Sequence, residues 1–160
     1  MTESARMRLD FLVRVVRKEI ELVMFAQRSV FLPYFTLENA RALNQDPEFA
    51  MKVEAFASRF ARLQDTVGDK LLPAWLEILS ERIGPAIDNL NKAEKLGVLN
   101  SVDDWLVVRG LRNQMVHEYI ESLEVLTDAL NQANKHVELI VSCANAIIRD
   151  CQQRGLIAGD

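Results

Sequence analysis

Between Arg112 and Tyr119, a guanidinium, an amide, an imidazole and a phenol fall within eight residues of one another. An arginine is a permanent cation, and its planar fork of donors suits phosphate oxygens. A histidine can transfer a proton near neutral pH. Arg112 and His117 could therefore serve phosphoryl chemistry without a metal ion, provided that the backbone brings them together.

The spacing of these two residues opposes a self-contained pair on one helix. Five residues turn roughly 500° around a straight helix, so Arg112 and His117 would point about 140° apart. The side chains can converge only if the helix ends or breaks between them, or if the arginine of one subunit meets the histidine of another. The residues between them include neither glycine nor proline, so the local sequence does not predict a break.

Simpler interpretations of the same residues stay open. A histidine near a helix end is commonly a surface or capping residue, and Arg112 could pair with Glu118 or Glu121. The pair His117-Glu118 does not complete the HExxH pattern of zinc proteases, because position 121 is Glu. His136 is the only other histidine, and no cysteine lies near either one. We therefore expect no metal site, and nothing in the sequence indicates a cofactor.

A second polar group, Arg59, Arg62 and Asp65, lies on the helix that we expect after residue 46. Arg62 and Asp65 stand three residues apart and can pair along one helix face. The simple interpretation is a salt-bridged surface. The alternative is that these residues line the same cleft as Arg112.

The first long element is an amphipathic helix expected at about 3–30, where apolar residues recur at three- and four-residue steps. A cluster of apolar side chains then surrounds Pro33. A packed turn is favoured there over an aromatic binding platform, and its members are Phe31, Leu32, Tyr34 and Phe35. A short helix is expected at 36–44, with Thr36 as its cap.

The second long helix is predicted to begin at Asp46-Pro47, an N-cap carboxylate followed by proline at the first helical position. The helix should weaken around Gly68 and bend or restart near Pro73, because an internal proline removes a hydrogen bond. It continues to about residue 82. Its spacing predicts a core seam of Phe49, Val53, Phe56, Phe60, Leu63 and Val67.

The second half of the chain is expected to hold a helix at 85–96, the helix that carries the motif and a long last helix at about 121–154. Ser101 with Asp104 predicts a capping box for the motif helix, which delivers Arg109 and Arg112 on adjoining faces. The last helix has a heptad seam that could be core or partly a dimer interface. Its members are Leu123, Leu126, Leu130, Ala133, Val137, Ile140, Ala144, Ile147 and Cys151.

These elements predict an all-α fold, a bundle of four main helices with one or two additional short helices, forming a single domain over residues 1–160. The chain has only six Gly and four Pro, which favours few turns and long elements.

Charge and composition narrow the classes of partner. A formal net charge of −4 argues against holding nucleic acid by bulk electrostatics, so any RNA contact must be local.

Cys143 and Cys151 lie about 12 Å apart along one expected helix, too far for a disulfide, and are best interpreted as buried thiols in a reducing compartment. The sequence has no apolar signal core and no membrane-spanning stretch, which makes the cytoplasm the expected location.

The pattern Arg112-Asn113-xxx-His117-x-Tyr119 resembles the HEPN superfamily and, within it, the HepT-like toxins of toxin–antitoxin pairs. In that family an arginine, usually followed by a polar residue, precedes a histidine by four to six residues, and the HepT branch adds a tyrosine two places later. The motif lies late in the chain, between a Trp-bearing helix and a long terminal one.

The resemblance implies a homodimer whose motifs meet across a cleft and form a metal-independent ribonuclease. By analogy His117 would assist proton transfer and Arg112 would stabilise the charge on the phosphorane, with Asn113 and Arg109 in support. The family also implies a minimal nucleotidyltransferase antitoxin that transfers AMP to the motif tyrosine, here Tyr119 (AMPylation). The added negative charge beside Arg112 would then block an RNA phosphate.

Two other functions stay open. Some relatives are described as nucleotide-binding partners of a nucleotidyltransferase, so the chain could be a non-catalytic subunit that binds a nucleotide or substrate. It could also be an interaction bundle without chemistry, as the heptads of the last helix would allow.

Overall fold

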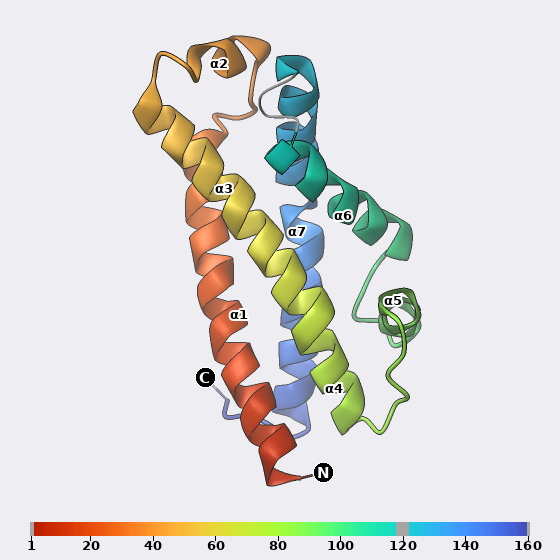
Figure 1. Ribbon diagram of the computed structural model, residues 1–160. Coiled ribbons are helices and arrows are strands. Elements are labelled where there is room, and N and C mark those ends of the chain that lie inside the picture. The colour runs from red at the N-terminus through yellow and green to blue at the C-terminus, as the bar shows by residue number, and fades with distance from the viewer. Residues whose placement is uncertain (1, 118–121, 160) are drawn as a thin grey trace.

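The computed structural model describes residues 2–117 and 122–159, with the backbone alone at 116 and 117, and in this part of the chain every regular element is a helix (Figure 1). Short helices α2 (Leu37–Ala42) and α5 (Ala86–Lys95) flank the bundle. The longer elements are α1 (Glu3–Val30), α3 (Pro47–Thr66), α6 (Val102–His117) and α7 (Leu123–Gln153). The expected all-α bundle of four main helices is confirmed.

Most helix ends lie where the sequence places them, because their caps are local. Asp46 accepts a hydrogen bond from the backbone N–H of Phe49 at 3.0 Å, with Pro47 in the first turn of α3. Thr36 and Asn39 form a reciprocal capping box at the start of α2. Ser101 accepts from the N–H of Asp104 at 3.1 Å, as expected for the N-cap of α6. Side-chain caps satisfy N–H groups that the first helical turn leaves unpaired.

The predicted weak point of the second long helix is a π-helical turn, η1 (Val67–Leu71), which links α3 directly to α4 (Leu72–Ile78). The N–H of Leu72 bonds to the carbonyl of Val67, a step of five residues. Because Pro73 has no N–H, the ordinary bonding pattern cannot continue at that position. The π turn lies immediately before it, so α3, η1 and α4 form one continuous rod across the face of the bundle (Figure 1).

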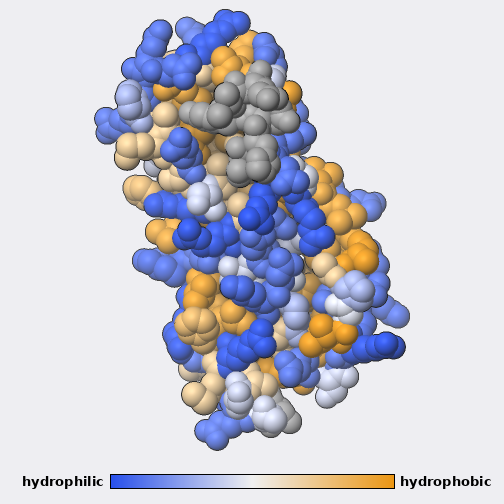
Figure 2. All heavy atoms as spheres, viewed as in Figure 1, coloured by the Kyte–Doolittle hydropathy of each residue, from blue (hydrophilic) through white to orange (hydrophobic). Residues whose placement is uncertain are grey.

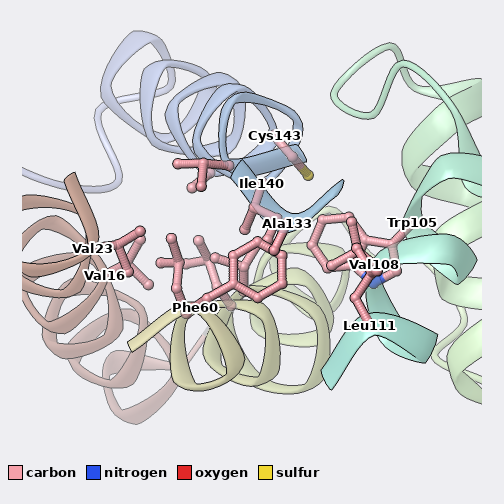
Figure 3. Packing of buried hydrophobic residues seen from close by; sticks show 14 of the residues in the cluster. Val16, Val23, Phe60, Trp105, Val108, Leu111, Ala133, Ile140 and Cys143 are labelled. Atoms are coloured by element: carbon pink, nitrogen blue, oxygen red, sulfur yellow. The ribbon is translucent and has the colours of Figure 1, made fainter. Parts of the chain in front are cut away.

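Side chains from all four main helices meet in one apolar core. Figure 3 shows Val16 and Val23 of α1, Phe60 of α3 and Ile140 of α7 directed toward one another, with Trp105 of α6 beside them. The heptad seam of α7 is buried within the protomer except for Leu123, which is partly buried; its buried members are Leu126, Leu130, Ala133, Val137, Ile140, Ala144, Ile147 and Cys151. The seam therefore belongs to the core and needs no partner subunit to explain it.

The apolar cluster around Pro33 is only half buried. Phe31 and Phe35 are buried as a packed turn requires, whereas Leu32 and Tyr34 are exposed. The short helix α5 at the edge of the bundle packs through Leu90 and Ala93, and its Ile87 is exposed.

Within the described residues, none of the helices has the length and apolar character that crossing a membrane requires.

Candidate functional site

Helix α6 presents its polar residues beside a narrow buried stripe. Trp105, Val108, Leu111 and Met115 are buried and fasten α6 to the bundle. The intervening positions are exposed or half-exposed, as is typical of a helix at the edge of a core. The buried face of α6 thus belongs to the scaffold, and its exposed face carries the candidate site.

Arg112 is held by a carboxylate from another helix. Its Nη1 lies 2.7 Å from Oδ1 and 2.6 Å from Oδ2 of Asp65, near the end of α3. The two side chains are 45% and 35% exposed, so the pair is open to solvent. Both contacts use one nitrogen, and the guanidinium makes no other hydrogen bond to a described residue, so none of these residues occupies its Nε and Nη2 edge.

Arg109 forms a second, looser contact one turn earlier. Its Nη2 lies 4.0 Å from Oδ1 of Asp69 in η1, and both side chains are exposed. Arg109 and Arg112 therefore face Asp69 and Asp65 across the junction of α6 with α3 and η1. Asn113, the other supporting residue of the motif, is exposed, and its side chain has no hydrogen-bond partner among the described residues.

Gly68 permits the close approach of α6 to the π turn. A Cβ atom at this position would lie 3.0 Å from Cζ2 of the buried Trp105. The indole can therefore lie against the backbone of η1 only because residue 68 lacks a side chain. The same junction of α6 with α3 and η1 carries the contact between Asp65 and Arg112.

A cleft of about 510 Å³ lies between α3, α6 and the start of α7. This volume is within the usual range for small-molecule sites. Its floor is apolar and consists of buried side chains, among them Ala57, Ala61, Met115, Leu126 and Leu130. Its rim is polar and carries Glu54, Ser58, Arg62, Asp65 and Arg112.

The second polar group of the sequence divides between two places. Arg62 and Asp65 line the same cleft as Arg112, which confirms the alternative for these two residues. Arg59 does not: its Nη1 donates to the carbonyl of Leu22 in α1 at 3.0 Å. The expected pairing of Asp65 with Arg62 is replaced by the pairing with Arg112, because α6 brings a guanidinium from a distant part of the sequence.

Glu19 of α1 places a carboxyl group against the end of α3, close to this junction. Its Oε1 lies 3.1 Å from the hydroxyl of Thr66, whereas its Oε2 is buried without a hydrogen-bond partner among the described residues. Burial raises the pKa of the Glu19 carboxyl above its ordinary value, and the bond from Thr66 and the charges of Arg62 and Lys70 offset part of that rise.

The backbone of α6 is helical from Arg112 to His117 without a break. The two positions thus stay about 140° apart around one helix, as the spacing predicts. Tyr119, Glu118 and Glu121 lie outside the described residues, so the predictions that concern them stay predictions. Over the described residues, no three His, Cys, Asp or Glu side chains are grouped so that they could hold a metal ion.

Sequence reasoning missed the partner of Arg112. Asp65 is 47 residues away in the sequence, and no local spacing signals a contact between two helices at that distance.

The cysteines are buried as expected, and burial raises the pKa of both Cys143 and Cys151 to about 12, which makes them poor nucleophiles.

The chain matches no family model, no curated protein and no solved structure.

Proposed function

We propose that this protein is a metal-independent ribonuclease of the HEPN type that acts as a cytoplasmic homodimer and serves as the toxin of a toxin–antitoxin pair. The proposal starts from the motif Arg112, Asn113, His117 and Tyr119, which is complete in the sequence. The observation that carries it is the state of Arg112. Its guanidinium stands on the rim of a cleft and is fixed at Nη1 by Asp65, and no other described residue bonds to its Nε and Nη2 edge.

That free edge suits a phosphate because Nε and Nη2 can donate two parallel hydrogen bonds to two oxygens of one phosphate group. A guanidinium fixed before the substrate arrives needs little reorganisation during the reaction. In cleavage, the 2′-hydroxyl attacks the phosphorus and loses its proton, and the bond to the leaving oxygen breaks as that oxygen gains one. Arg112 stabilises the charge on the phosphorane, and His117 transfers a proton at one of these two oxygens.

The unbroken backbone of α6 supports the proposal of a second subunit. Within one protomer, positions 112 and 117 lie about 140° apart around the same helix. In a homodimer, the arginine of one protomer can face the histidine of the other. Arg109 and Asn113 then support the same site from neighbouring positions of α6.

The proposed partner is a minimal nucleotidyltransferase antitoxin, which transfers AMP to the hydroxyl of Tyr119 with release of pyrophosphate from ATP. The attached phosphate places a negative charge near Arg112, where it competes with the RNA phosphate. Tyr119→Phe should therefore leave cleavage intact but make the nuclease resistant to the antitoxin.

Cleavage of RNA by the purified protein, without the antitoxin and with EDTA present, is the direct test. The wild type should cut RNA, and His117→Ala and Arg112→Ala should each lose most of this activity, since one such electrostatic contact contributes about 3 to 4 kcal/mol to the barrier. His136→Gln is the matched control, because His136 lies on α7 and bonds locally to the carbonyl of Gln132. Cleavage by His117→Ala at the wild-type rate would refute the proposal.

The cleft favours one alternative, a non-catalytic subunit that binds a nucleotide for a nucleotidyltransferase. Its apolar floor could hold a base while an arginine on the rim holds a phosphate. This alternative predicts nucleotide binding and tight association with the transferase, without RNA cleavage or growth arrest on expression. Growth arrest that depends on Arg112 would count against it.

A further inference from the structure

We propose that Arg62 and the free edge of Arg112 form a two-arginine phosphate site within a single protomer. Neither the motif nor the proposed reaction uses Arg62, which lies on α3 outside the motif helix. The ligand would be a phosphate monoester or a phosphodiester. That this phosphate belongs to an RNA strand rests on the proposed ribonuclease function, whereas the phosphate site itself does not.

Arg112 supplies the first half of the site. Asp65 occupies Nη1 with both of its oxygens, at 2.6 and 2.7 Å, and so fixes the guanidinium from one side. Nε and Nη2 point away from that contact by the planar geometry of the group, and they are the pair that binds two oxygens of one phosphate. Asp65 thus acts as a positioning residue for Arg112.

Arg62 supplies the second half. Arg62 is exposed and lines the same cleft, and its guanidinium makes neither a hydrogen bond nor an ion pair with another described residue. Its backbone carbonyl accepts a hydrogen bond from Thr66. It stands three residues before Asp65 on α3, and residues at this spacing are neighbours on the helix surface, with Cβ atoms about 5 to 6 Å apart. Asp65, which holds Arg112, is therefore a direct neighbour of Arg62 on the surface of α3.

The local charge favours an anion. Asp65 neutralises one of the two arginines, which leaves one positive charge from these three residues at this end of the cleft. The carboxyl of Glu19 on α1 also interacts with the charge of Arg62, but its burial disfavours the ionised form of that carboxyl. Glu54, the other carboxylate on the rim, lies eight residues from Arg62 on α3, about 12 Å along the helix axis. Hydrophilic side chains extend across the middle of the viewed face, over α3 and toward α6 (Figure 2).

Titration of the full chain with inorganic phosphate, followed by NMR of the arginine Nε–Hε signals, tests the site directly. The signals of Arg62 and Arg112 should shift together with one dissociation constant. Arg62→Gln and Arg112→Gln should each weaken phosphate binding by about tenfold, as expected for the loss of a charge-assisted contact. Arg41→Gln is the matched control, since Arg41 is exposed on α2 outside the cleft. Arg62→Lys should recover part of the affinity.

A second arm uses a short single-stranded RNA whose 2′-hydroxyls are methylated so that it cannot be cut. If the site serves an RNA strand, Arg62→Gln weakens binding of this oligonucleotide by a similar factor, and phosphate competes with it. If the site serves a small phosphorylated ligand, phosphate binding depends on Arg62 but oligonucleotide binding does not.

The proposal is overturned if Arg62→Gln, folded as judged by its thermal unfolding, binds phosphate as the wild type does. The two-arginine site and the ribonuclease activity can be refuted independently of each other. Phosphate binding without cleavage would refute the ribonuclease alone, and cleavage with an unchanged KM in Arg62→Gln, together with unchanged phosphate binding, would refute the two-arginine site alone.

Discussion

The two sides of α3 meet their neighbours in different ways. Toward α1 the contact is mainly apolar: Phe56 packs edge-on against Phe31, directly after α1, with ring centroids 4.9 Å apart, and Phe60 is fully buried. The polar contacts on that side are those of Arg59 with Leu22 and of Thr66 with Glu19. Toward α6, Asp65 forms an ion pair with Arg112, and Trp105 packs on Gly68 of the adjoining η1.

We infer from this difference that the α1 side of the rod stabilises the fold and that the α6 side binds the ligand. Burial of apolar surface supplies most of the free energy of folding, so the interface with α1 fixes the rod in place. Exposed ion pairs contribute little to stability. The charged groups at the junction with α6 can therefore bind a ligand without a large cost to the folded state. Four changes would test this contrast, from the largest expected effect to the smallest.

Phe60→Ala should cause the largest loss. Phe60 is fully buried and lies beside Val16 and Val23 of α1 in the core (Figure 3). Truncation removes its burial and leaves a cavity, which typically costs about 3 to 5 kcal/mol of unfolding free energy. Urea denaturation followed by circular dichroism measures this loss. A cost below about 1 kcal/mol, within the range of ordinary surface substitutions, would show that this side is not the stabilising interface.

Gly68→Ala should destabilise the protein, although alanine is the better helix former. The added methyl group would lie 3.0 Å from the buried ring of Trp105, and overpacking of this kind costs about 1 to 3 kcal/mol. The matched control is Gly110→Ala on α6, where the new methyl group meets nothing within 4 Å. This control should stabilise by up to about 1 kcal/mol. Equal effects of the two changes on the unfolding midpoint would contradict the role given to Gly68.

The pair Asp65 and Arg112 should matter little for stability. A double-mutant cycle with Asp65→Asn and Arg112→Gln, measured by urea denaturation, should give a coupling of about 0.2 to 1 kcal/mol, because both side chains are partly exposed. The coupling should decrease in high salt. A coupling above about 2 kcal/mol would make this pair a structural element and weaken its assignment to ligand binding.

Glu19→Gln should give the smallest effect, and the effect should depend on pH. The folded state raises the pKa of this carboxyl above its ordinary value of 4.5, so ionisation is less favourable in the folded state than in the unfolded one. Wild-type stability should therefore fall relative to the variant as the pH rises from 4.5 through the raised pKa. Glu19→Gln should be the more stable form at neutral pH, with the gain absent at low pH.

That last comparison is made by urea denaturation at pH values between about 3.5 and 8, on both sides of the ordinary carboxyl pKa. A constant difference between the two proteins at all pH values would show that the charge of Glu19 does not cause it.

Much of the fold is predictable because helix formation depends on near neighbours. The seam from Phe49 to Val67, the cap at Asp46 and the heptads of α7 all rest on spacings of three or four residues, and the structure confirms them, with Phe49 and Leu123 partly buried. Gly68 and Pro73 predicted a weak point in a helix that continues beyond it, and the structure places a π turn there, which the sequence did not predict.

The sequence alone determined the helices, their inward faces and the presence of a guanidinium, an imidazole and a phenol near the end of α6. Only the tertiary structure decided that Arg112 meets Asp65, that Arg62 shares its cleft and that Arg59 does not. The physical reason is that periodicity specifies which face of a helix is apolar, but not which helix comes to lie against it. The charged groups at a junction are then brought together by apolar packing elsewhere, here by Trp105 against the one residue of the π turn that lacks a side chain.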